Sequence, residues 1–140
     1  MPIRLIDRPS PNFDERPREA KIDVLVLHYT GMNTLNEALD RLVDPVTEVS
    51  AHYLISEAGD VYYMVDETNR AWHAGSSYWR GMAEINAHSI GIELQNPGHE
   101  FGYRPFPGSQ MGALKELCDD ILSRYPIPAR NVIGHSDIAP

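Results

Sequence analysis

The sequence predicts an α/β or α+β fold, built on a mixed β-sheet, in a single domain that spans residues 1–140. Two observations support this prediction. Short apolar or alternating segments, typical of strands, interleave along the chain with segments whose apolar residues recur at helical spacing. The length of 140 residues suits one domain, because it allows a sizeable core but not two independent ones.

The N-terminal part of the chain predicts a leader segment followed by a buried strand. Residues 8–20 combine three prolines with charged residues and show little periodicity, so we expect regular structure to begin near Ile22. Residues 24–29 (VLVLHY) form an apolar, β-branched run that is typical of a strand buried on both faces. This strand places His28 at its carboxyl end.

A short amphipathic helix is predicted next. Thr34 and Glu37 form a capping-box pattern, which marks the start of a helix, and Pro45 prevents its continuation. The apolar residues at helical spacing between them are Leu35, Ala38, Leu39 and Leu42.

Two further strand predictions follow. Residues 52–56 and 61–65 predict a β-hairpin, since Gly59 in the connection suits a tight turn. Residues 89–95 alternate strictly, which places Ile90, Ile92 and Leu94 on one face of a strand. Glu93 therefore lies on the opposite face from this apolar set.

The C-terminal third predicts a loop, a helix and a strand. Residues 96–108 contain three prolines and three glycines, and we expect this long loop to border a binding cleft. A second helix is predicted from about Ser109 until Pro126 ends it. Its apolar stripe comprises Met111, Leu114, Leu117, Cys118, Ile121 and Leu122. Residues 131–135 then predict a short strand that carries His135 at its end.

Charge and composition exclude several classes of function. The 12 basic and 20 acidic residues give a net charge of −8, which would repel nucleic acid and anionic membranes. Residues 1–8 lack the apolar region of a signal peptide, and the chain has no apolar run long enough to span a membrane. The lone Cys118 excludes an internal disulfide and suits a reducing compartment. We therefore expect a cytoplasmic protein without membrane insertion, and no obligate protein partner is evident.

Three side chains are candidates for chemistry. His28 and His135 end two separate apolar strands, and rigidly held neutral imidazoles are good zinc ligands. The alternative is that each histidine caps its strand or is hydrogen-bonded in the core. Glu93 is either a general base near a metal-activated water or a solvated carboxylate on a half-exposed strand. Spacing alone leaves these alternatives open.

Five segments together resemble an ordered motif set of a known enzyme family. They are residues 26–30 (VLHYT), 50–55 (SAHYLI), 71–75 (AWHAG), 89–94 (SIGIEL) and 134–140 (GHSDIAP). In this order they resemble the type 2 N-acetylmuramoyl-L-alanine amidases. That family includes cell-wall recycling amidases of anhydromuramoyl peptides, phage amidases and peptidoglycan recognition proteins. The resemblance runs from about Arg8 to Pro140 and implies a central mixed sheet flanked by helices, with a zinc groove on one face.

The resemblance also implies a reaction and roles for individual residues. The implied reaction is zinc-dependent hydrolysis of the amide between the lactyl group and L-alanine in peptidoglycan or muropeptides. His28 and His135 match the first two zinc ligands, and Glu93 matches the residue that activates water. Trp72 and His73 are candidate substrate-binding residues of the groove, because an aromatic face packs against a sugar or peptide stem and an imidazole supplies a polar contact. Structural packing is an equal alternative for Trp72. A non-catalytic peptidoglycan-binding module with the same fold is the alternative function.

Other polar residues are given structural roles. His52 lies on a strand rich in apolar residues, so we expect it to be buried and hydrogen-bonded. His88 and His99 are expected on the surface or in loops. Asp137 lies only two residues after His135, a spacing that suits a residue that forms or orients a turn better than a further zinc ligand.

The last motif normally continues, in this family, to a lysine that stabilises the oxyanion and an aspartate that is the third zinc ligand. The sequence stops at Pro140, before both. We therefore expect the chain to be truncated from a longer protein, with a degenerate family member as the alternative. We expect this chain to bind zinc weakly through two histidines and solvent, or to borrow a ligand from a neighbouring molecule.

Overall fold

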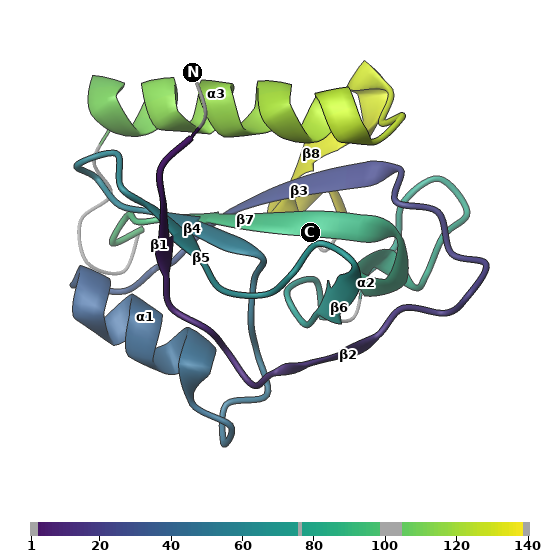
Figure 1. The fold of residues 1–140 in the computed structure, drawn as a ribbon, viewed down its shortest axis with the longest axis horizontal. Helices are drawn as coiled ribbons and strands as arrows, with labels where there is room; N and C mark the ends of the chain where they lie inside the picture. Colours follow the sequence, from purple (N-terminus) through teal and green to yellow (C-terminus); the bar gives the residue numbers. More distant parts are fainter. Residues whose placement is uncertain (1–2, 76, 99–104, 139–140) are drawn as a thin grey trace.

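A six-stranded mixed sheet forms the centre of the computed structural model, which describes residues 3–75, 77–98 and 105–138 (Figure 1). The strands lie in the order β1-β5-β4-β7-β3-β8. Their bounds are β1 Leu5–Asp7, β3 Val24–Tyr29, β4 Tyr53–Ile55, β5 Val61–Tyr63, β7 Ser89–Leu94 and β8 Val132–Gly134. Neighbouring strands are parallel except β4 and β5, which form the predicted antiparallel hairpin. The prediction of a mixed sheet is confirmed.

Two helices cover opposite faces of this sheet (Figure 1). The first, α1 (Leu35–Val43), begins as predicted, because the Thr34 hydroxyl accepts a hydrogen bond of 3.2 Å from the Glu37 backbone N–H. Its buried residues are Ala38, Leu39 and Leu42, as expected. The second, α3 (Gly108–Arg124), lies across the other face.

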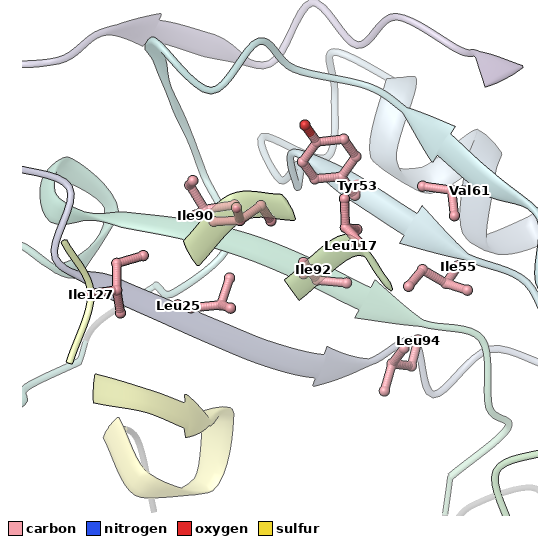
Figure 2. Close-up of a cluster of buried hydrophobic side chains, with 10 residues drawn as sticks. Leu25, Tyr53, Ile55, Val61, Ile90, Ile92, Leu94, Leu117 and Ile127 are labelled. Atoms are coloured by element: carbon pink, nitrogen blue, oxygen red, sulfur yellow. The ribbon is translucent and has the colours of Figure 1, made fainter. Parts of the chain in front are cut away.

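The two faces of β3 and β7 have different neighbours. Figure 2 shows the larger core, in which strand residues such as Leu25, Ile90 and Ile92 pack with Leu117 of α3. Because side chains alternate along a strand, Glu93 lies on the opposite face, as predicted. The helix α3 therefore covers one face of β3 and β7, and polar side chains can lie on the opposite face.

Part of α3 differs from the prediction. Leu117 and Ile121 are buried, but Leu122 is 38% exposed, so its assignment to the apolar stripe was wrong. One residue advances a helix by about 100°, which turns Leu122 away from the sheet when Ile121 faces it.

Several short elements were not predicted from the sequence. We expected regular structure to begin near Ile22, yet β1 pairs with β5, and β2 (Phe13–Glu15) pairs with β6 (Asn69–Ala71). Three residues are too few to show a periodicity, so these strands depend on partners that are distant in the sequence. The others are α2 (Ile85–His88), the 3₁₀ helix Ala129–Asn131 and α4 (His135–Ile138).

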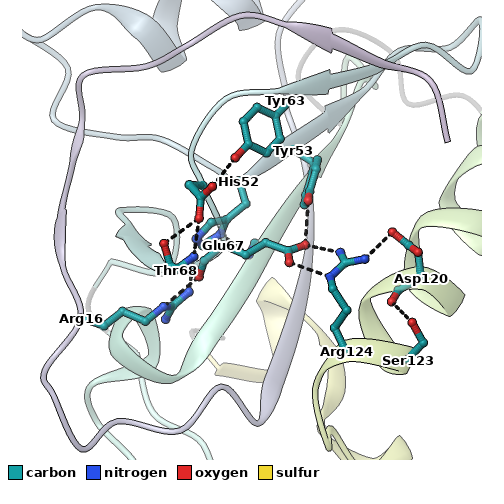
Figure 3. A network of polar contacts seen from close by, with 11 residues as sticks. Arg16, His52, Tyr53, Tyr63, Glu67, Thr68, Asp120, Ser123 and Arg124 are labelled. Atoms are coloured by element: carbon teal, nitrogen blue, oxygen red, sulfur yellow. Dashed lines mark hydrogen bonds and ion pairs between the residues drawn. The ribbon is translucent and has the colours of Figure 1, made fainter. Parts of the chain in front are cut away.

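A buried polar network ties α3 to the chain that follows the hairpin (Figure 3). Arg124 donates two hydrogen bonds to the Glu67 carboxylate, at 3.0 and 2.6 Å, and the Tyr53 hydroxyl donates a third at 2.7 Å. Glu67 is 8% exposed, so these charge-assisted bonds compensate its desolvation.

Two further expectations concern the loop that follows β7 and the possibility of a membrane span. Residues 99–104, which include His99 and part of the predicted cleft-bordering loop, lie outside the described residues. Among the residues that are described, no helix is both long and apolar enough to cross a membrane.

Candidate active site

Three parallel strands end at the same edge of the sheet and bring the candidate residues together. His28 on β3 is the register partner of Glu93 on β7, and β8 runs parallel to β3 and ends immediately before His135. A cavity of about 670 Å³ lies at this edge. Its lining includes all five predicted site residues, which are His28, Trp72, His73, Glu93 and His135.

The rings of His28 and His135 lie side by side, with their centroids 4.9 Å apart and their planes inclined by 50°. His28 is 7% exposed, whereas His135 is exposed. Burial, together with the charge that His135 would carry, lowers the pKa of His28 to about 3. His28 is therefore neutral near pH 7, which is the form of imidazole that binds metal ions.

His73 lies directly against His28 and connects it to the start of β7. Its Nδ1 is 2.9 Å from Nε2 of His28, and its Nε2 is 2.9 Å from the Ser89 hydroxyl oxygen. Burial, followed by the nearby charges of other histidines and an arginine, lowers the pKa of His73 well below its usual range. Both ring nitrogens of His73 are thus occupied by protein partners.

Gly91 makes room for the ring of His73. A Cβ atom at Gly91 would lie 2.4 Å from Cγ of His73, far inside van der Waals contact. The glycine of the 89–94 motif therefore allows the imidazole to pack closely against β7.

His52 is fully buried behind this layer, as expected. The Gly91 backbone N–H donates to its Nδ1 at 3.1 Å, so Nε2 carries the proton and donates to the Asn69 carbonyl at 2.9 Å. Burial lowers the pKa of His52 to about 3. The prediction of a hydrogen-bonded core histidine is confirmed.

Glu93 has the properties of a general base. Burial raises the pKa of its carboxyl group to about 8, partly opposed by the positive charge of Arg41. Its Oε2 is buried and has no hydrogen-bond partner among the described residues. A carboxyl group of this kind can exchange a proton with a ligand in the cavity near neutral pH.

The remaining predicted residues make specific local contacts. The Trp72 indole N–H donates to Asp14 at 3.1 Å, and Asp14 also accepts a 2.7 Å bond from Arg70. The Asp137 carboxylate accepts a hydrogen bond of 2.9 Å from the Gly134 backbone N–H, which agrees with the predicted turn-orienting role.

The side chains at this site are of the types that bind zinc. Two imidazoles converge beside a buried carboxyl group that lacks a hydrogen-bond partner among the described residues. Within the same part of the chain, no group of three metal-binding side chains occurs. Catalytic zinc sites commonly use three protein ligands, and His28 and His135 would supply two of them to a zinc ion bound here.

The sequence model of the N-acetylmuramoyl-L-alanine amidase family matches residues 18–140. This chain belongs to that family. The N-acetylmuramoyl-L-alanine amidase AmiD of Escherichia coli is 40% identical over 132 residues, which cover 86% of this amidase-family chain and 47% of AmiD. The 1,6-anhydro-N-acetylmuramyl-L-alanine amidase AmpD of Haemophilus influenzae is 34% identical, over 94% of this chain and 79% of AmpD. The chain therefore spans about half the length of AmiD and most of AmpD.

Solved structures of the family have the same fold. A crystal structure of AmpD superimposes with a TM-score of 0.80 at 30% identity, over 99% of this chain and 83% of that one. AmiD from Escherichia coli was solved with the substrate anhydro-N-acetylmuramic acid-L-Ala-D-gamma-Glu-L-Lys. It gives a TM-score of 0.78 at 38% identity, over 90% of this chain and 53% of that one.

Two features of the site were not predicted from the sequence. Ser89 completes the hydrogen-bonded series with His73 and His28, but no local pattern links residues this far apart in the sequence. Arg41 also lines the cavity. In the sequence, Arg41 lies three residues after Ala38, and residues with this spacing are neighbours on one face of a helix.

Proposed function

We propose that this chain is a zinc-dependent N-acetylmuramoyl-L-alanine amidase that hydrolyses the amide between the lactyl group and L-alanine of muropeptides. The observation that carries the proposal is the meeting of Glu93, His28 and His135 in one cavity of a family member. This choice of substrate is supported by the name of AmiD, an N-acetylmuramoyl-L-alanine amidase, by the name of AmpD, a 1,6-anhydro-N-acetylmuramyl-L-alanine amidase, and by the peptide bound to AmiD.

His28 and His135 would hold the zinc ion. Zinc, when bound, supplies Lewis acidity that polarises an amide carbonyl and acidifies water. Because Nε2 of His28 is engaged by His73, we assign His73 to the positioning of His28 instead of to direct contact with substrate. For Trp72, substrate contact and structural packing are both alternatives. Its indole N–H already donates a hydrogen bond to Asp14.

Glu93 would move the proton. In the proposed reaction its carboxylate accepts a proton from the attacking water and then donates it to the alanine amine as the C–N bond breaks. A pKa raised towards neutrality suits both steps, since the group must be a base in the first and an acid in the second.

Replacing Glu93 tests the reaction. With a defined anhydromuramyl tripeptide and added zinc, Glu93→Gln should lower release of the free peptide by about 10²- to 10⁴-fold. Mass spectrometry of the products measures this loss, and a sample with chelator tests the metal requirement. Zinc binding should persist in the variant, because Glu93 is not one of the proposed ligands.

The outcomes separate the two candidate functions. Retained hydrolysis by Glu93→Gln would remove Glu93 from the mechanism. A wild-type chain that binds the muropeptide but releases no peptide would instead favour the peptidoglycan-binding module.

A further inference from the structure

Arg41 lines the cavity and forms no ion pair with any of the described residues. It is exposed in the last turn of α1, and it is the only lysine or arginine among the described residues that line the cavity. Glu93 is the only carboxylate in the same lining. The cavity therefore offers a ligand one permanent positive charge close to the proposed catalytic carboxyl group.

Among the described residues, three other arginines form ion pairs. Arg8 binds Asp40 at 2.9 Å, Arg70 binds Asp14, and Arg124 binds both Glu67 and Asp120. No carboxylate of the described residues pairs with Arg41, although Glu37 stands one helical turn before it. Within the part of the chain that the structure describes, the Arg41 guanidinium can thus bind an anion without first giving up an ion-pair partner.

The ligand of the proposed function carries a suitable anion. In a stem that begins L-Ala-D-γ-Glu, the glutamate is linked through its side chain, so its α-carboxylate remains free. This carboxylate is the one nearest to the bond that is cut, and two extended residues span at most about 7 Å. A cation beside the catalytic carboxyl group is therefore placed within reach of it, and a guanidinium binds carboxylates through two parallel N–H donors.

We propose that Arg41 is a specificity-determining residue that binds the free α-carboxylate of the second residue of the stem peptide. This inference rests on the proposed function for its ligand. It predicts discrimination between peptides that carry this carboxylate and peptides in which it is an amide.

Binding measurements test the inference separately from catalysis. Titration calorimetry uses the Glu93→Gln protein, in which turnover is expected to be at least about 100-fold slower, and two anhydromuramyl tripeptides that differ only in the carboxylate or carboxamide at this position. Adding Arg41→Gln should weaken binding of the carboxylate peptide about tenfold and leave the carboxamide peptide unchanged. Arg41→Lys should retain part of the preference as a point charge.

A matched control is Arg130→Gln, which removes an exposed arginine that does not line the cavity and should change neither affinity. Circular dichroism of each variant checks that it is folded. Equal affinities of the two peptides for the Arg41-containing protein, or an equal loss for both peptides in Arg41→Gln, would overturn the inference. Hydrolysis by the wild-type chain is assayed in parallel, so failure of the proposed function is recognised independently.

Discussion

The hydrogen bonds around His28 determine which of its nitrogens can bind a ligand in the cavity. Nε2 of His28 faces Nδ1 of His73, and Nε2 of His73 faces the Ser89 hydroxyl. If His28 donates through Nε2–H, then His73 accepts at Nδ1 and donates to Ser89, and Nδ1 of His28 keeps a free lone pair. This arrangement satisfies each ring while all remain neutral. His73 and Ser89 would then orient the zinc ligand from behind, a role that outer residues commonly have in metal sites.

Removing the partner of His28 should weaken zinc binding. We expect His73→Ala to lower zinc affinity by about 10- to 100-fold, because the orientation of the His28 ring is no longer fixed. Competition with a chromophoric chelator measures the affinity without requiring activity. His88→Gln is the matched control, since Nδ1 of the His88 ring lies 3.1 Å from the Lys21 carbonyl oxygen and His88 does not line the cavity. Unchanged zinc affinity in His73→Ala would limit His73 to packing or substrate contact.

At the scale of the element, β7 organises the site by carrying different groups at successive positions. Ile90, Ile92 and Leu94 pack towards α3, while Gly91 and Glu93 face the histidines. Because Gly91 has no Cβ atom, the His73 ring lies directly against it. The Gly91 backbone N–H also donates a hydrogen bond to His52. One strand thus positions two histidine rings and supplies the proposed base.

A methyl group at Gly91 should disturb this arrangement. Gly91→Ala would place Cβ 2.4 Å from Cγ of His73, so the ring must move or the strands must separate. Overpacking of this kind costs about 1–3 kcal/mol, which urea denaturation would measure as a loss of unfolding free energy. Zinc affinity should fall as well.

The control is Gly112→Ala in α3, where a new Cβ meets no atom within 4 Å. This change should stabilise the protein by about 0.5–1 kcal/mol, because alanine is the better helix former. If Gly91→Ala were as stable as the wild type, the close packing of His73 on β7 would be wrong.

The sequence predicted elements whose signals are local. The strand Val24–Tyr29 has a continuous apolar run, Ser89–Leu94 alternates, and the helix Leu35–Val43 carries its own cap and apolar stripe. The strands Leu5–Asp7 and Phe13–Glu15 were missed, because three residues carry no period and their pairing depends on distant partners. Element type was therefore predictable where burial and capping are encoded within the element itself.

The site was predictable to a similar degree. His28 and Glu93 lie near the carboxyl ends of apolar strands, and His135 comes directly after one. Their gathering at one edge follows from parallel strand ends once the topology is known. Arg41 was missed because an arginine on a short amphipathic helix has the pattern of a solvated face. Ser89 was missed because its contact with His73 exists only after the strand and the intervening loop have packed.

At the scale of the whole molecule, burial of several titratable groups makes folding depend on pH in opposing ways. Burial lowers the pKa of His28 and His52 to about 3, and lowers that of His73 well below 6.5. Between pH 6.5 and 5 the unfolded chain therefore binds protons at these three residues that the folded chain does not. The contribution of these neutral, buried histidines to the free energy of unfolding is fully present above pH 6.5 and is lost as the pH falls.

Glu93 acts in the opposite direction in the same interval. Its pKa is raised from 4.5 to about 8, so between these values the folded protein binds a proton that the unfolded chain does not. Stability from this group increases as the pH falls from 8 towards 4.5. Three histidines outweigh one carboxyl group, so the unfolded chain binds a net excess of about two protons near pH 5.5.

The zinc-free protein should therefore lose about 3 kcal/mol of unfolding free energy per pH unit near pH 5.5. Urea denaturation in the presence of chelator, at several values between pH 6.5 and 5, measures this slope. Removing the opposing carboxyl group in Glu93→Gln should steepen the dependence to about three protons, and His52→Gln should reduce it to about one. The comparison uses slopes and not absolute stabilities, so a general destabilisation by either substitution does not imitate the result. A slope that is identical in all three proteins would show that neither His52 nor Glu93 has the shifted pKa that its burial requires.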